Sequence, residues 1–179
     1  MLAPRLHDAV SLRHFAVVDR LDICQSAHES YPLPRWCSEV HTEISRAAGR
    51  EPTCQTILTA TWLGEPVEPS IEEFEKVYEL QVALNDGRRP PQDDRGEAES
   101  IFFAEKHSGT FLTDDNGAFD FAERRLGRGR VVDSIYVLQT AVANGDLSAR
   151  DAAQIANDIE GAERHFRRCH RPPFTHTMF

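Results

Sequence analysis

The sequence lacks several features that would assign it to a common class of protein. Its cysteines, Cys24, Cys37, Cys54 and Cys169, form no Cys-x-x-Cys pair and have no regular spacing, which argues against a structural zinc motif or a disulfide framework. No run approaches about 18 apolar residues, and the N-terminus has no apolar core before a small-residue cleavage site. We therefore expect a soluble, cytoplasmic protein with free thiols and no membrane partner.

The motifs of several other sites are also missing: the chain has no Gly-x-Ser-x-Gly elbow for a nucleophile, no glycine loop for phosphate and no His-x-x-x-His pair for a metal. The chain has no basic excess either: 20 Lys and Arg stand against 29 Asp and Glu, a net charge of −9. Contact with a polyanion therefore needs a local basic patch or metal ions. Arginine clusters at 124–130 and 164–171 could meet an RNA backbone, although a solvated helix face with its flanking turn is the favoured explanation. His170 to His176 is a weak candidate for metal chelation.

The length of 179 residues predicts a single domain over residues 1–168, followed by an irregular tail over 169–179. Apolar periodicity, β-branched runs and capping residues predict an alternation of strands and helices. The expected strands are 2–7 (interrupted by Pro4 and Arg5), 34–38, 56–63, 110–113 and 130–133. The expected helices begin after Asp8, Ser38, Ser70, Arg95, Gly117, Asp133 and Ser148, and the last of them carries Ile155, Ile159, Ala162 and Phe166 on one stripe. This alternation is typical of the α/β class, with a mainly parallel sheet covered on both faces in a three-layer α/β/α arrangement.

Acidic residues recur at the ends of the expected elements. Asp8 precedes the first helix, Glu43 lies on the face of the second, Glu97 and Glu99 lie in the first turn of another, and Asp114 and Asp115 directly follow the strand at 110–113. The carboxyl ends of parallel strands meet at one edge of a sheet, where such folds bind ligands. Carboxylates gathered there repel one another unless cations lie between them, so the pattern predicts a site for Mg²⁺ or Mn²⁺.

These residues resemble the PIN domain, a metal-dependent nuclease family that includes the toxins of bacterial type II toxin–antitoxin pairs. The similarity lies in Asp8-Ala-Val-Ser-Leu12, Arg20-Leu21-Asp-Ile23, Val40-His-Thr-Glu43-Ile44, Gly96-Glu97-Ala-Glu99-Ser-Ile101-Phe-Phe-Ala104 and Phe111-Leu-Thr113-Asp114-Asp115. The resemblance implies that Asp8 and Glu43 are the first two metal-binding acids. It implies Glu97 as the third, with Glu99 one place removed, and Asp115 as the fourth, with Asp114 adjacent.

The resemblance also implies an activity: hydrolysis of RNA by a water activated by Mg²⁺ or Mn²⁺, with two ions about 4 Å apart if both bind. The hydroxyl of Thr113 or the amide of Asn116 would orient a water or a phosphate oxygen. The implied partners are an RNA substrate, a small antitoxin protein and a second copy of the chain.

Simpler explanations exist for each acid taken singly. The helix dipole stabilises Glu97 and Glu99 in a first turn, and Asp8 and Asp115 are ordinary helix-capping residues. Two other functions fit the same pattern: a PIN-like binding or regulatory module without catalysis, and a metal-dependent phosphoesterase that acts on a non-nucleic substrate.

Overall fold

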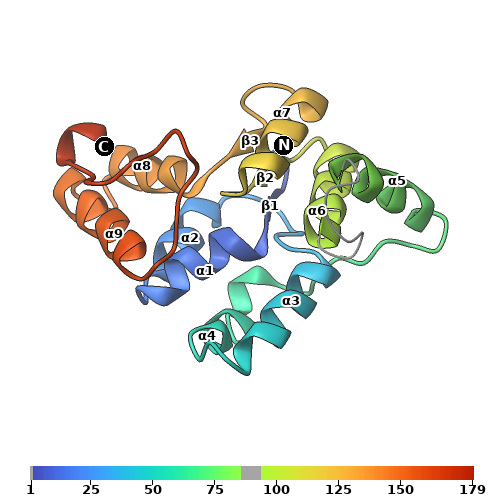
Figure 1. Cartoon of the computed structure of the whole chain (residues 1–179), viewed down its shortest axis with the longest axis horizontal. Helices are drawn as coiled ribbons and strands as arrows, with labels where there is room; N and C mark the ends of the chain where they lie inside the picture. The colour runs from blue at the N-terminus through green and yellow to red at the C-terminus, as the bar shows by residue number, and fades with distance from the viewer. Residues whose placement is uncertain (1, 86–93) are drawn as a thin grey trace.

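The computed structural model describes residues 2–85 and 94–179, and this part of the chain is mostly helical with a small parallel sheet (Figure 1). The strands are β1 (Arg5–His7), β2 (Thr110–Leu112) and β3 (Val131–Val132). The helices are α1 (Ala9–Val17), α2 (Leu21–His28), α3 (Ser38–Ala48), α4 (Cys54–Leu58), α5 (Phe74–Asn85), α6 (Arg95–Lys106), α7 (Asn116–Leu126), α8 (Ser134–Asn144) and α9 (Ala149–Gly161), with short 3₁₀ segments η1 (Thr61–Leu63) and η3 (His176–Met178).

The sheet has the order β1-β2-β3, and both pairs of strands are parallel. Leu6 pairs in register with Phe111, and Phe111 pairs with Val131. All three strands therefore end at the same edge, where Asp8, Thr113 and Asp133 follow them.

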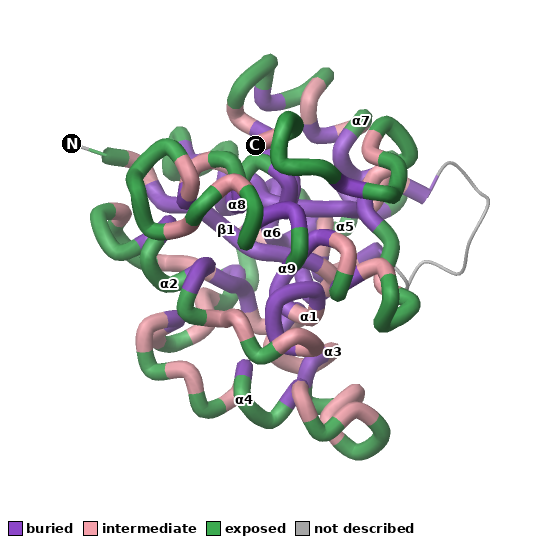
Figure 2. The backbone as a smooth tube through the Cα atoms, turned by 90° about the vertical axis from the view of Figure 1, so that its left-hand side faces the viewer, coloured by how far each residue is buried: buried purple, intermediate pink, exposed green. Residues whose placement is uncertain are grey.

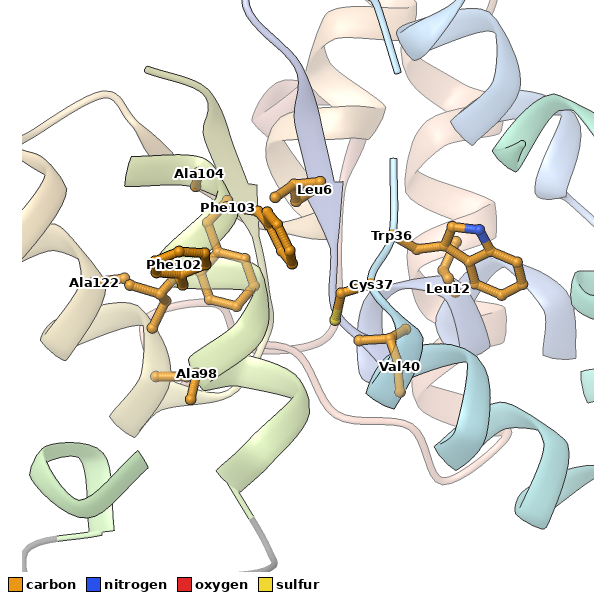
Figure 3. Packing of buried hydrophobic residues seen from close by; sticks show 14 of the residues in the cluster. Leu6, Leu12, Trp36, Cys37, Val40, Ala98, Phe102, Phe103, Ala104 and Ala122 are labelled. Carbon is orange, nitrogen blue, oxygen red and sulfur yellow. The ribbon is translucent and has the colours of Figure 1, made fainter. Parts of the chain in front are cut away.

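Neighbouring residues of a strand belong to different hydrophobic cores. Phe111 lies in a core shared with α3, α6 and α7, whereas Leu112 lies in a core shared with α1, α2, α8 and α9. Figure 3 shows part of the first core, in which Leu6, Phe103 of α6 and Val40 of α3 lie together. Since successive strand residues point to opposite faces, the sheet is buried on both sides. Figure 2 shows this buried interior, with exposed residues along the outer turns.

Several predicted elements are confirmed. The helices expected after Asp8, Ser70, Arg95, Gly117, Asp133 and Ser148 are present, and the strands expected at 110–113 and 130–133 are present in shorter form. The strand expected at 2–7 is limited to Arg5–His7. The loop expected between Asn85 and Asp94 falls on residues 86–93, which lie outside the described part of the chain.

The strand predicted at 56–63 is wrong, because this segment forms α4 and η1. The side chains of Thr56 and Thr59 donate hydrogen bonds back to the carbonyls of Thr53 and Gln55, at 2.7 and 3.1 Å. Such bonds let threonine fit a helical turn despite its preference for strands. The same turn buries Cys54 and Ile57 on one side.

Two further boundaries differ from the prediction. The segment 34–38 is not one of the three strands of the sheet: it forms an isolated bridge between Cys37 and Val67, and its Arg35 carbonyl accepts a hydrogen bond from the His7 amide of β1 at 2.8 Å. The last long helix ends at Gly161, so Phe166 reaches the core through the following turn. Within the described residues, no helix has the length and apolar character needed to cross a membrane.

Candidate metal centre

Asp8 is the first buried carboxylate at the edge of the sheet. It directly follows β1 and caps α1 as predicted, because its Oδ1 accepts a hydrogen bond from the Ser11 amide at 2.7 Å. Its Oδ2 accepts a hydrogen bond from the hydroxyl of Thr113. The side chain is 1% exposed, and burial raises its pKa to about 6 against the opposing effect of these hydrogen bonds. Asp8 therefore binds protons far more readily than an ordinary aspartate.

Thr113 joins the ends of two strands. While its hydroxyl donates to Asp8 after β1, the same oxygen accepts a hydrogen bond from the Asp115 amide at 3.1 Å after β2. The single hydroxyl proton is thereby used in holding Asp8. Thr113 acts on the site by positioning a carboxylate, which differs from the predicted contact with a water or a phosphate.

Asp115 and Asp114 point to different neighbours, which separates two residues that the sequence left as alternatives. Asp115 caps α7 by accepting from the Ala118 amide at 2.8 Å, and it remains half-buried. Asp114 is buried against α1 and α8: it accepts from the Ser134 hydroxyl at 2.5 Å and lies 3.2 Å from Nδ1 of His14. Asp114 therefore pairs with residues of α1 and α8, and its charge contributes to the raised pKa of Asp8.

Glu97 and Glu43 complete the group of carboxylates. Burial raises the pKa of Glu97 well above its ordinary value, and the charges of Glu43, Asp8 and Asp115 raise it further. Within the described ranges, Oε2 of Glu97 is buried and has no hydrogen-bond partner. Burial, followed by the charges of Asp8 and Glu39, raises the pKa of Glu43 to about 7. The fold thus brings together the four acids predicted from the sequence, and we refer to Asp8, Glu43, Glu97 and Asp115 as the carboxylate cluster.

Glu99, the predicted alternative to Glu97, is fully occupied elsewhere. Its carboxylate accepts hydrogen bonds from the Ser38 hydroxyl at 3.0 Å, the Glu39 amide at 3.1 Å and Nε of Arg95 at 3.2 Å. Two of these donors belong to the first turn of α3, whose exposed amides favour an anion. Glu99 therefore fastens α6 to α3, and its oxygens are not available to the cluster.

Gly96 leaves the space in which Glu43 lies. A Cβ atom at position 96 would come closer to Oε1 of Glu43 than non-bonded atoms allow, and it would also press on Val40. We expect Gly96→Ala to displace the Glu43 carboxylate and to weaken Mn²⁺ binding by at least about tenfold, since even outer-shell changes reach this size at metal sites.

The fold should survive this change, because alanine is favoured over glycine inside a helix by about 1 kcal/mol. Calorimetric titration with Mn²⁺ and thermal unfolding test both points. The matched control is Gly161→Ala at the end of α9, where a Cβ would have no atom within 4 Å. Equal Mn²⁺ affinities for the two variants would contradict the placement of Glu43.

A cleft of about 760 Å³ opens beside the carboxylate cluster. Asp115 lies on its wall together with Asp94 and Asp120, and Arg124 and Arg125 of α7 line the same space. Of the carboxylate cluster, Asp115 lines this cleft, and Asp8, Glu43 and Glu97 do not.

Sequence reasoning missed Asp133, although the signal was the same as for Asp8: an acid directly after a strand. Asp133 caps α8 through the Tyr136 amide at 3.0 Å, and its Oδ2 lies 2.8 Å from Nε2 of His170. Burial opposes its ionisation, but hydrogen bonds from His170 and Tyr136 and the charge of Arg167 lower the pKa overall. Asn116, the predicted alternative to Thr113, accepts from the Arg168 amide at 3.0 Å, so the C-terminal segment occupies it.

The donor chemistry of the carboxylate cluster fits hard divalent cations. It offers oxygen ligands only, and it contains a buried carboxylate oxygen without a partner and three carboxyl groups with raised pKa values. No three of its members have ligand atoms all within 4.8 Å of one another. Binding of one ion by three of these acids would therefore require their side chains to move closer together.

Comparisons of the chain with protein-family models, with curated proteins and with solved structures found no significant match to any of them.

Proposed function

We propose that the chain is a Mg²⁺- or Mn²⁺-dependent endoribonuclease with a PIN-like three-layer architecture. The observation that carries this proposal is the buried, unpartnered oxygen of Glu97 among three other carboxylates. A group of that kind destabilises the metal-free fold, because burial and like charges both oppose ionisation. Residues with a purely structural role, such as Glu99, have their oxygens paired instead.

The carboxylates of Asp8, Glu43, Glu97 and Asp115 would hold the ions. Bound ions would lower the pKa of a water, orient the scissile phosphate and neutralise charge on the leaving oxygen. Thr113 positions the Asp8 carboxylate, and the amide of Ala118 in α7 positions Asp115. Asp114 accepts hydrogen bonds from the amide and the hydroxyl of Ser134, at the start of α8.

The cleft beside the cluster supports a polymeric substrate. With a net charge of −9, attraction to RNA must be local. Arg124 and Arg125 provide such a patch along α7, on the wall that also holds Asp115. Arg125 is paired with Glu105 at 2.9 Å, an exposed ion pair of small energy that a phosphate can replace.

A toxin role and a small antitoxin partner are further parts of the proposal. Val77 and Leu80 of α5 are buried, whereas Tyr78 and Val82 on the same helix and the preceding Ile71 are exposed. These exposed side chains give an apolar surface of the kind that a partner chain buries. A second copy of the chain could use the same surface.

Cleavage of single-stranded RNA by the purified protein tests the proposal. We expect cleavage with Mn²⁺ and none after chelation, because the proposed nucleophile is a water that the bound ion activates. Persistent cleavage in chelator would refute a metal-dependent mechanism. Mn²⁺ binding with activity on a small phosphodiester alone would indicate a non-nucleic substrate, and absence of Mn²⁺ binding would indicate a binding or regulatory module.

A further inference from the structure

A second group of potential metal ligands lies at the end of β3, apart from the carboxylate cluster. In the described residues, Asp133, Cys169 and His170 are the set in which one carboxylate oxygen, the Sγ atom and one imidazole nitrogen all lie within 4.8 Å of one another. Asp133 comes from the sheet edge, and the other two come from the C-terminal segment. The sequence alone could not show this, because 35 residues separate Asp133 from the Cys-His pair.

The C-terminal segment is held in place on both sides of the Cys-His pair. Phe166 before it and Phe174 after it are 5% and 4% exposed, and their rings pack edge to face with centroids 5.2 Å apart. Asn157 of α9 makes two hydrogen bonds with the backbone of Phe174, at 2.9 and 3.0 Å. The Arg168 amide donates to Asn116 at 3.0 Å. These contacts fix the ligands without needing a metal, as in a preformed site.

We propose that Asp133, Cys169 and His170 bind a borderline divalent ion of the Zn²⁺ class. Thiolate and imidazole are ligands that Zn²⁺ accepts and that Mg²⁺ and Ca²⁺ avoid, so this site differs in selectivity from the carboxylate cluster. Binding would release the Cys169 thiol proton, and any proton that His170 carries, to solvent. Three protein ligands leave one position for water or for a further ligand.

The positive charge of Arg167 opposes a cation here. Its guanidinium lies 3.5 Å from Oδ2 of Asp133, but it also lies 3.6 Å from Asp120 and stacks 3.2 Å above the ring of Phe119. Arg167 can keep its contacts with Asp120 and Phe119 when an ion replaces its guanidinium beside Asp133. The alternative to a metal is that the Asp133–His170 pair simply fastens the C-terminal segment.

Calorimetric titration with Zn²⁺ distinguishes metal binding from simple fastening of the C-terminal segment. We use the Glu97→Gln protein as the parent, because this substitution weakens metal binding at the carboxylate cluster. Adding Cys169→Ser should weaken Zn²⁺ binding by at least about 100-fold, because the thiolate is lost. It should leave the metal-free unfolding temperature unchanged, because Cys169 is exposed and the Asp133–His170 contact remains. The matched control is His176→Gln, an exposed histidine of the same segment, which should bind Zn²⁺ like the parent.

Titration with Co²⁺ provides a direct readout of the sulfur ligand. We expect a thiolate-to-cobalt charge-transfer absorption in the parent and in His176→Gln, and none in Cys169→Ser. Absence of Zn²⁺ binding in the parent would overturn the proposal, as would equal Zn²⁺ affinities for the parent and Cys169→Ser. Neither outcome depends on whether the chain cleaves RNA.

Discussion

Replacing Glu97 with glutamine should reduce Mn²⁺-dependent RNA cleavage by at least about 100-fold and make the metal-free protein no less stable than the wild type. Loss of a direct ligand should exceed the 10- to 100-fold effect typical of outer-shell residues. The stability change has the opposite sign to most buried substitutions, because the pKa of Glu97 is raised by burial and by three neighbouring carboxylates. A neutral amide of the same shape removes that unfavourable ionisation.

Cleavage assays and chemical denaturation in chelator measure the two effects separately. Glu75→Gln is the matched control, since Glu75 is an exposed glutamate in the first turn of α5 and does not line the cleft. It should change neither quantity appreciably. A Glu97→Gln protein that keeps wild-type cleavage would remove Glu97 from the site, and one that unfolds more easily would show that Glu97 has a structural role.

Glu99→Gln should show the reverse pattern. Its carboxylate accepts three hydrogen bonds: glutamine keeps one oxygen that can accept from Ser38 and Glu39, but its amide nitrogen cannot accept from Arg95. We expect a loss of about 1–3 kcal/mol in unfolding free energy, the usual cost of leaving buried donors unsatisfied. Mn²⁺ affinity should change little. Two glutamates two positions apart on α6 would thus be distinguished by opposite effects on stability and on metal binding.

Two members of the carboxylate cluster were predictable because they obey a local rule. Asp8 and Asp115 follow strands and cap helices, so their positions depend only on where β1 and β2 end. The choice between Glu97 and Glu99 was not predictable, because both lie near the start of α6. It depends on α3, whose first turn takes the Glu99 carboxylate and leaves that of Glu97 without a partner.

The parts that sequence reasoning missed depend on contacts between distant segments. The segment 56–63 has strand-forming residues, yet burial of Ile57 and Leu63 beside α3 and threonine back-bonding favour helical turns. Asp133 was overlooked because its partners, Arg167 and His170, lie more than 30 positions later. Local patterns therefore indicated the acids that follow β1 and β2, whereas the contacts that the C-terminal segment makes at the end of β3 could not be predicted.

Mn²⁺ affinity at the carboxylate cluster should rise steeply with pH, by up to about tenfold per pH unit for each proton that the ion displaces. The pKa values are raised to about 6 for Asp8 and about 7 for Glu43, and that of Glu97 is raised well above its ordinary value. Binding below pH 7 must therefore release protons. Calorimetry in two buffers of different ionisation enthalpy measures the number released.

Glu43→Gln should release fewer protons than the wild type at pH 6.5, because one of the displaced protons is gone. Affinity that does not change between pH 6 and pH 8 would show that the cluster does not receive the ion. The buried imidazoles of His7 and His28 do not disturb this test, because they bind no ion in the proposed site and they titrate mainly at lower pH.

The same pKa values fix the sign of a stability change in the metal-free protein. Carboxyl groups whose folded pKa is raised keep protons that the unfolded chain has already lost, so the folded state binds more protons between about pH 4 and pH 7. Their contribution to stability therefore falls as pH rises through this window. The depressed pKa of His28, about 4, acts in the opposite direction below pH 6.5. Denaturation of Asp8→Asn and Glu43→Gln in chelator isolates the carboxyl contribution: both variants should gain stability relative to wild type as pH rises from 5 to 8, and saturating Mn²⁺ should reverse that order.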